Sequence, residues 1–115
     1  MPSIDPRGQL LKGALPLLVL GALEEGELYG YEIVARLEAR SDGVVAPSEG
    51  SLYPVLYRLE AEGAVAAAWR DGNRGPRRRY YRLTEAGTRL LASERATWDA
   101  FSGAVTRLAS EPGRG

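Results

Sequence analysis

The side chains best suited to chemistry are arginines gathered in one short stretch. Between Arg70 and Arg82 the sequence holds six arginines and a single acid, Asp71, although the whole chain of 115 residues has a formal net charge of zero. Guanidinium groups bind phosphate oxygens through parallel hydrogen bonds, and like charges crowded on a short segment repel one another. The stretch therefore indicates binding of a polyanion, with a solvated loop tip as the alternative. The candidate phosphate-binding residues are Arg74, Arg77, Arg78 and Arg79.

Other kinds of chemistry lack their usual residues. The sequence contains no cysteine and no histidine, which removes disulfides, thiolate nucleophiles, the common acid-base side chain and most transition-metal ligands. Adjacent carboxylates such as Glu24 and Glu25 do not face one another on a helix, so they make no paired acid and base. We therefore expect no enzyme, no metal site and no cofactor.

Length and composition predict one globular domain. The chain is 44% hydrophobic and 26% charged, which is ordinary for a soluble protein. Its longest apolar stretch, residues 14–23, contains Pro16 and Gly21 and is shorter than the roughly 20 residues that cross a bilayer. The first residues lack the pattern of a secretory signal. We expect a cytoplasmic protein without a membrane-spanning segment.

Apolar residues at helical spacing predict three helices in the first half of the chain. Pro16 falls in the first turn of the first helix, where a proline is tolerated. Ser48 is a natural N-cap for the third helix, and Pro54 inside that helix predicts a bend. The predicted ranges are 13–25, 31–40 and 48–62.

Two short segments, 65–69 and 78–83, are separated by the turn-forming residues 71–76 and predict a β-hairpin. Alternation of side chains directs Tyr81 and Leu83 of the second strand toward the core. Three helices followed by an arginine-tipped hairpin are the arrangement of a winged helix-turn-helix, a mainly α fold with a small β-hairpin. Such a unit places its third helix in the major groove of DNA and its hairpin against a flanking groove or the backbone.

The exposed side of the third helix offers polar groups suited to base edges and phosphates. For Tyr53 and Tyr57 the alternative is half-buried packing, and for Arg58 it is a solvated surface charge. The candidate residues are Ser48, Glu49, Ser51, Tyr53, Tyr57 and Arg58.

The last helix, residues 84–110 with Thr84 as N-cap, is too long for the rest of the domain. At 1.5 Å per residue it reaches roughly 40 Å, whereas a body of about 80 residues is roughly 30 Å across. Its apolar stripe predicts pairing with the same helix of a second copy, with folding back over the first helix as the alternative. The predicted homodimer interface contains Leu91, Trp98, Phe101, Val105 and Leu108.

These elements predict four parts of the chain. We expect a flexible N-terminus (1–12), a winged helix-turn-helix domain (13–83), a long C-terminal dimerisation helix (84–110) and a disordered tail (111–115).

Three strings resemble the PadR family of bacterial transcriptional regulators. They are LYGYEI (28–33), PSEGSLYPVLYRLEAEG (47–63) and RRRYYRLTEAG (77–87). Their order and spacing together are specific, and the match extends over about residues 13–108. The single C-terminal helix is similar to the short branch of that family, and Gly50 and Pro54 also fit its pattern.

This resemblance implies a homodimeric regulator, generally a repressor, that binds a pseudo-palindromic operator in double-stranded DNA and releases it when a small molecule arrives. It implies that Trp98 is a platform for a flat aromatic ligand between the subunits, with plain dimer packing as the alternative. Because the net charge is zero, a winged-helix dimer that binds a protein partner and no DNA is the rival function. The DNA-binding residues that the resemblance implies are Tyr29, Ser48, Ser51, Tyr53, Arg58, Arg77 and Arg78.

Overall fold

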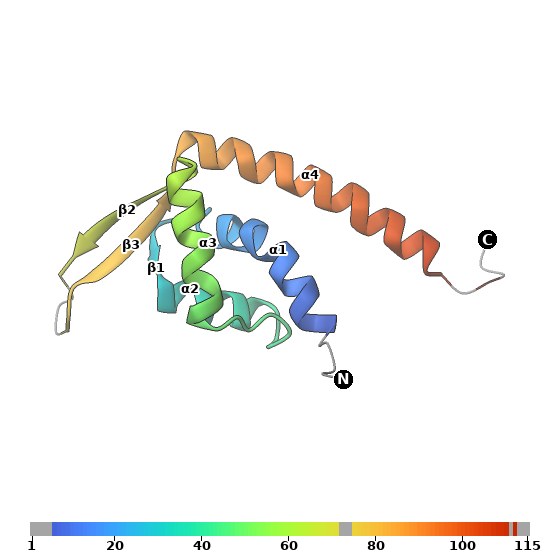
Figure 1. Ribbon diagram of the computed structural model, residues 1–115, viewed down its shortest axis with the longest axis horizontal. Coiled ribbons are helices and arrows are strands. Elements are labelled where there is room, and N and C mark those ends of the chain that lie inside the picture. Colours follow the sequence, from blue (N-terminus) through green and yellow to red (C-terminus); the bar gives the residue numbers. More distant parts are fainter. Residues whose placement is uncertain (1–5, 72–74, 111, 113–115) are drawn as a thin grey trace.

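The computed structural model describes residues 6–71, 75–110 and 112 (Figure 1). These residues form four helices and three strands, which confirms the mainly helical fold class with a small antiparallel sheet. They are α1 (Pro6–Ala22), β1 (Leu28–Tyr29), α2 (Gly30–Arg40), α3 (Glu49–Ala61), β2 (Val65–Arg70), β3 (Arg78–Leu83) and α4 (Glu85–Leu108).

Helix α1 begins at Pro6, so the predicted start at Gly13 was wrong. Proline favours the first position of a helix, where its missing N–H costs nothing. The added turns also have a packing partner, because Leu11 lies against the hydrophobic core. Residues 8–12 of the predicted flexible N-terminus are therefore helical, and Pro16 lies in the helix interior rather than in its first turn. The tail predicted at 111–115 lies outside the described residues except for Pro112.

The sheet has three strands in the order β1-β3-β2, all antiparallel. The β2–β3 hairpin, called the wing below, runs in register from Val65 opposite Leu83 to Arg70 opposite Arg78. Strand β1 was missed, because two residues are too few to show an alternating pattern. It pairs Leu28 with Tyr81, which ties the start of α2 to the base of the wing.

The core lies where α1, α2, α3, the sheet and the start of α4 meet. Tyr81 is 1% exposed at its centre, and Leu83 is partly buried against it, which confirms that both side chains face inward. Leu91 of α4 is also only 1% exposed within the single chain. Its place in the predicted dimer interface was therefore wrong, because Leu91 is covered by its own domain.

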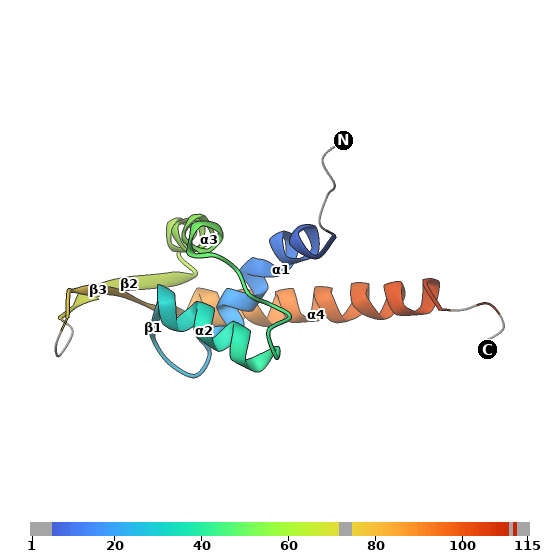
Figure 2. The same cartoon turned by 90° about the horizontal axis from the view of Figure 1, so that it is seen from below.

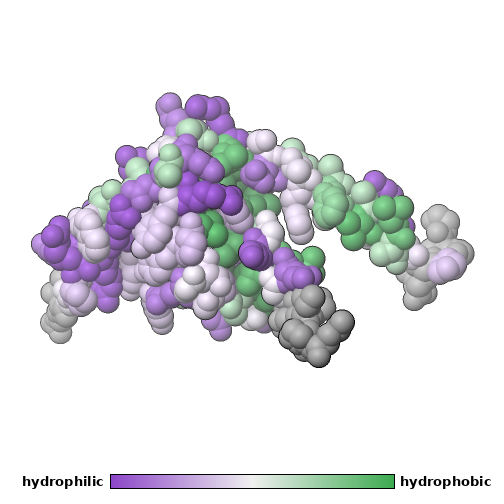
Figure 3. All heavy atoms as spheres, viewed as in Figure 1, coloured by the Kyte–Doolittle hydropathy of each residue, from purple (hydrophilic) through white to green (hydrophobic). Residues whose placement is uncertain are grey.

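The second half of α4 projects from the body, and the molecule extends over 58 × 36 × 26 Å. Figures 1 and 2 show the helix running away from the other elements in both views. Hydrophobic side chains lie along this projecting part, as Figure 3 shows. Trp98 is 44% exposed, Phe101 63%, Val105 45% and Leu108 86%. The exposed stripe is thus not covered by α1 of the same chain.

Polar contacts connect the middle of α4 to the body. Arg95 donates to both carboxylate oxygens of Glu24, with N···O distances of 3.0 and 2.7 Å. The hydrogen bond from Arg95 lowers the pKa of Glu24 below its ordinary value. Arg36 donates to the carbonyl oxygen of Ala22 at 3.1 Å. These contacts connect the end of α1 with α2 and the middle of α4. In the part of the chain described, no helix is both long and apolar enough to span a bilayer.

The other end of α4 depends on one glycine. A Cβ added at Gly87 would overlap the carbonyl oxygen of Ala64, at a separation that no real contact allows. Thr84, the N-cap, accepts from the Gly87 N–H at 3.0 Å and donates to the carbonyl oxygen of Gly63. The backbone of α4 therefore crosses the start of β2 in direct contact, which sets the angle between α4 and the wing.

We predict that Gly87→Ala destabilises the fold by about 1–3 kcal/mol or more, because the Ala64 backbone cannot move aside freely. Gly13→Ala is the matched control, since Gly13 is also helical but has open space where a methyl group would be added. That variant keeps or slightly raises stability. Urea unfolding of both variants measures the difference in stability. Equal unfolding midpoints would contradict the close contact between the backbones of α4 and the start of β2.

Candidate nucleic-acid interface

Helix α3 turns an apolar face inward and a polar face outward. Leu52, Leu56 and Leu59 are fully buried, so the opposite side of the helix faces solvent. The helix starts where Ser48 accepts from the Ser51 N–H at 3.1 Å, which satisfies one of the free donors of the first turn. The predicted contact residues on the exposed face are Ser48, Glu49, Ser51, Tyr57 and Arg58.

Tyr53 occupies an intermediate position between core and surface. Its ring stacks on that of Tyr57 with centroids 6.0 Å apart. A Cβ added at Gly30 would lie only 2.6 Å from the Tyr53 hydroxyl oxygen. Burial, followed by the charge of Glu49 and the neighbouring Tyr57, raises the pKa of Tyr53 above its ordinary value. A larger residue at Gly30 would therefore displace the Tyr53 ring, and Tyr53 combines packing with a hydroxyl at the surface.

The arginines of the wing differ in their surroundings. Arg78 lies over the ring of Tyr29, 4.7 Å from its centroid, and Arg77 lies 5.9 Å from the centroid of Trp69. Arg77 also pairs with Asp71 at 3.3 Å, but both side chains are more than 60% exposed, so water screens the pair. Both arginines present charge to solvent beside an aromatic ring. Arg74 lies outside the described residues.

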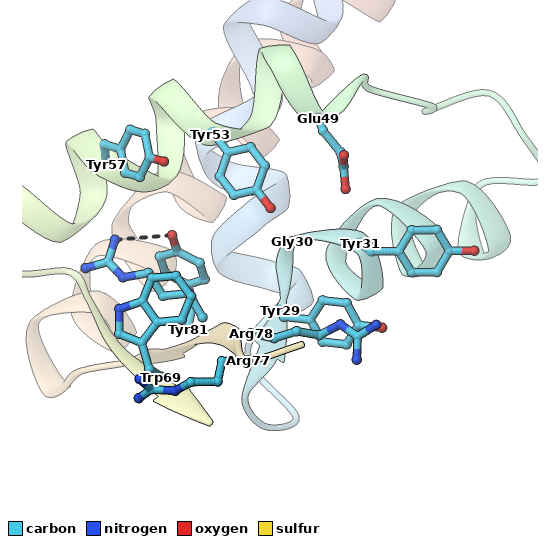
Figure 4. A pocket seen from close by; sticks show the side chains of 11 residues that line it. Tyr29, Gly30, Tyr31, Glu49, Tyr53, Tyr57, Trp69, Arg77, Arg78 and Tyr81 are labelled. Carbon is cyan, nitrogen blue, oxygen red and sulfur yellow. Dashed lines mark hydrogen bonds between the residues drawn. The ribbon is translucent and has the colours of Figure 1, made fainter. Parts of the chain in front are cut away.

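A groove of about 680 Å³ separates α3 from the wing and the start of α2. Its wall combines six aromatic rings, three guanidinium groups and one carboxylate, as Figure 4 shows. Such a surface offers flat apolar faces and cationic donors together, which suits a nucleic-acid strand. The groove residues are Tyr29, Gly30, Tyr31, Glu49, Tyr53, Tyr57, Trp69, Arg77, Arg78, Arg79 and Tyr81.

The fold thus brings together seven of the residues that the sequence singles out. The residues that line the groove are Tyr29, Glu49, Tyr53, Tyr57, Arg77, Arg78 and Arg79. Outside it, Ser48 is the N-cap of α3, and Ser51 and Arg58 lie on α3; Arg58 pairs with Glu62 one turn away at 3.5 Å. The candidate residues therefore extend from the groove onto the exposed face of α3.

Sequence reasoning missed Trp69 and Tyr31 as residues of this groove. Alternation along β2 places Trp69 on the same face as Val65, which is buried, yet Trp69 is 58% exposed. The reason is that the wing extends beyond the body, so its outer residues have no core beneath them. An aromatic residue directly before an arginine-rich turn is the signal that could have identified it.

Trp98 lies at a second location, on α4. Its side chain lines two hollows of about 360 and 480 Å³, one against α1 and α2 and one against α1 and residues 43–46. Both hollows are mainly apolar, and Leu18 of α1 borders each of them. The predicted ligand platform is therefore next to open apolar space.

Comparison with known proteins identifies relatives over most of the chain. Residues 19–93 match the transcriptional regulator PadR-like family. A transcriptional regulator of Mycobacterium tuberculosis is 34% identical over 84 residues, which cover 73% of this chain and 75% of that protein.

Solved structures show the same relationship. A PadR-like transcriptional regulator of Bacillus cereus is 34% identical with a TM-score of 0.75, and the alignment covers 90% of this chain and 99% of that one. PadR of Bacillus subtilis, solved in complex with operator DNA, is 26% identical with a TM-score of 0.64. That alignment covers 70% of this chain and 46% of that one, so the chain corresponds to less than half of the longer protein.

Proposed function

This chain belongs to the PadR-like family of transcriptional regulators, and from that membership we propose that it is a dimeric repressor that binds a pseudo-palindromic operator. Members of this family are regulators and not enzymes. The observation that carries the proposal is the groove lined by tyrosines and arginines between α3 and the wing. The structural similarity to PadR of B. subtilis, which was solved with operator DNA, supports the same interpretation.

The proposed DNA contacts divide between α3 and the wing, which together form the DNA-binding head of each subunit. Helix α3 enters the major groove, where the hydroxyls of Ser48 and Ser51 and the guanidinium of Arg58 meet base edges and phosphates. Arg77 and Arg78 of the wing bind backbone phosphates, and the Tyr29 ring supports Arg78 from behind. Tyr53 and Tyr57 lie between the two elements and contact the strand that passes through the groove.

A second copy covers the exposed stripe of α4. Burying Trp98, Phe101 and Leu108 stabilises a dimer by about 1.5–3 kcal/mol per side chain. Two heads whose α3 helices lie about 34 Å apart match one turn of B-DNA, with half-sites centred about 10 base pairs apart. The head then corresponds to residues 13–83 and the dimerisation helix to 84–110, and the dimer works in the cytoplasm, where its operator lies.

A small aromatic or hydrophobic ligand releases the DNA. The Trp98 ring borders open apolar space, and stacking on such a ring contributes about 0.5–1.5 kcal/mol beyond burial. The angle of α4 sets the spacing of the heads. A ligand acts only if it binds one spacing better than the other.

Arg77→Ala or Arg78→Ala should weaken binding to every duplex and reduce the slope of log K against log salt concentration by about one. Arg89→Ala is the control, because Arg89 is exposed on α4, away from the proposed interface. Changes at Tyr57 or Arg58 should instead alter sequence preference. Mobility shifts at several salt concentrations measure both effects, and unchanged slopes for the wing variants would contradict phosphate binding.

The same titration distinguishes DNA binding from the rival function, binding of a protein partner. A regulator binds random duplex weakly at low salt. If the wild-type protein shows no such binding, the groove serves a protein partner instead of DNA.

Phe101→Glu should convert the dimer into a monomer, because it places a charge in the middle of the apolar stripe. Thr106→Glu on the same helix is the control, since Thr106 is exposed and polar. Light scattering at micromolar concentration gives the mass of each variant. If the wild-type protein is already a monomer at this concentration, the proposed dimer is wrong.

In a Trp69→Phe background, planar aromatic compounds such as acridine should quench the remaining tryptophan fluorescence saturably. The chain has two tryptophans, so this background reports Trp98 alone. Saturable binding should disappear in Trp98→Ala when followed by calorimetry. Equal affinity in both proteins would place the ligand elsewhere.

A further inference from the structure

One arginine of the wing is bound differently from its neighbours. Arg79 on β3 pairs with Glu60 in the last turns of α3, with 2.6 Å between Nη2 and Oε2. The side chains are only 30% and 31% exposed. Its other terminal nitrogen, Nη1, donates to the hydroxyl of Tyr81 at 3.5 Å. A chain of polar contacts therefore runs from the centre of the sheet to α3.

This pair joins α3 to a part of the wing that lies beyond the hydrophobic core. The wing leaves the body beyond the core, and the outer residue Trp69, which pairs with Arg79 across the strands, is mostly exposed. The packing that holds the wing in place lies at its base, where Tyr81 and Val65 are buried. Arg79 lies two residues from Tyr81 on the same face of β3. Its contact with Glu60 therefore attaches the wing to α3 two residues farther out than the core does.

The same contact makes Arg79 unsuited to binding phosphate. Its charge is compensated at hydrogen-bond distance by a half-buried carboxylate, and binding DNA through Arg79 would leave Glu60 unpaired beside a polyanion. Arg77 and Arg78 have no such partner among the described contacts from α3. Arg79 therefore faces α3, whereas Arg77 and Arg78 lie beside Trp69 and Tyr29.

We propose that Arg79 and Glu60 are positioning residues that hold the wing at a fixed distance from α3, so that one duplex meets both elements at once. This inference rests on the proposed function. The pair acts through Arg77, Arg78 and the polar face of α3, because a rigid spacing lowers the entropy lost when both elements engage the DNA. Operator affinity depends on that spacing, whereas random duplex can be bound by charge alone.

The test uses Glu60→Gln and Arg79→Gln in the full chain. Partly exposed ion pairs contribute little to global stability, so both variants should fold, which circular dichroism checks. Arg79→Lys is the rescue variant, because it keeps the charge opposite Glu60. Matched controls are Arg82→Gln on the same strand and Glu94→Gln on α4, which remove the same charges from exposed positions.

The DNA measurement compares a duplex selected from a random pool by the wild-type protein with unselected duplex. Glu60→Gln and Arg79→Gln should lower the ratio of the two affinities by about three- to tenfold, without reducing the salt slope. Arg79→Lys should restore most of the ratio, and the controls should leave it unchanged. If Arg79→Gln weakens both duplexes equally and reduces the salt slope by about one, Arg79 is a phosphate contact and the proposal is wrong.

The second measurement needs no DNA. Amide hydrogen exchange in β2 and β3 should become about three- to tenfold faster in Glu60→Gln and Arg79→Gln, with the melting temperature nearly unchanged. Exchange at the wild-type rate would overturn the proposal. If the wild-type protein binds neither duplex at low salt, the proposed function fails, and the exchange rates still decide whether the pair holds the wing.

Discussion

Burial of the leucine face of α3 is the interaction that determines how the rest of the molecule is arranged. Leu52, Leu56 and Leu59 are fully buried, and this packing leaves the helix only one orientation. Ser51, Tyr57 and Arg58 then face solvent, because they lie on the opposite side of the same helix. The wing follows shortly after α3 ends, and its base is held by Tyr81 and by the short strand β1. One hydrophobic contact surface thus determines which polar groups can meet a partner.

The chain is neutral as a whole, but its arginines are concentrated in the wing. The acids after α1 are matched within the fold, since Glu24 pairs with Arg95, Glu25 with Arg40 and Glu27 with Arg70. These pairs lie mainly between structural elements. Arg77 and Arg78 of the wing lie beside aromatic rings, and the one acid that pairs with Arg77, Asp71, is screened by water because both side chains are exposed. Net charge alone therefore says little about nucleic-acid binding in a chain of this kind.

The sequence predicts the parts of this fold that depend on local signals. Ser48 and Thr84 mark the starts of α3 and α4, and the turn formers between the two wing strands mark the hairpin. Features that depend on contacts between residues far apart in the chain could not be predicted from the sequence. Leu91 belongs to the same stripe as Trp98, and only the fold shows that the first is covered by its own domain. Likewise, Arg79 and Glu60 are 19 residues apart, and nothing in their local sequence distinguishes this arginine from Arg77 and Arg78 beside it.

The proposed function requires above all that α3 and the wing of each head contact one duplex together. Amide hydrogen exchange of the wild-type protein, with and without a duplex recovered by selection, tests this requirement residue by residue. We expect slower exchange on binding in residues 49–58 and in β2 and β3, with little change in the second half of α4. Protection confined to α4, or found in α3 without the wing, would contradict it.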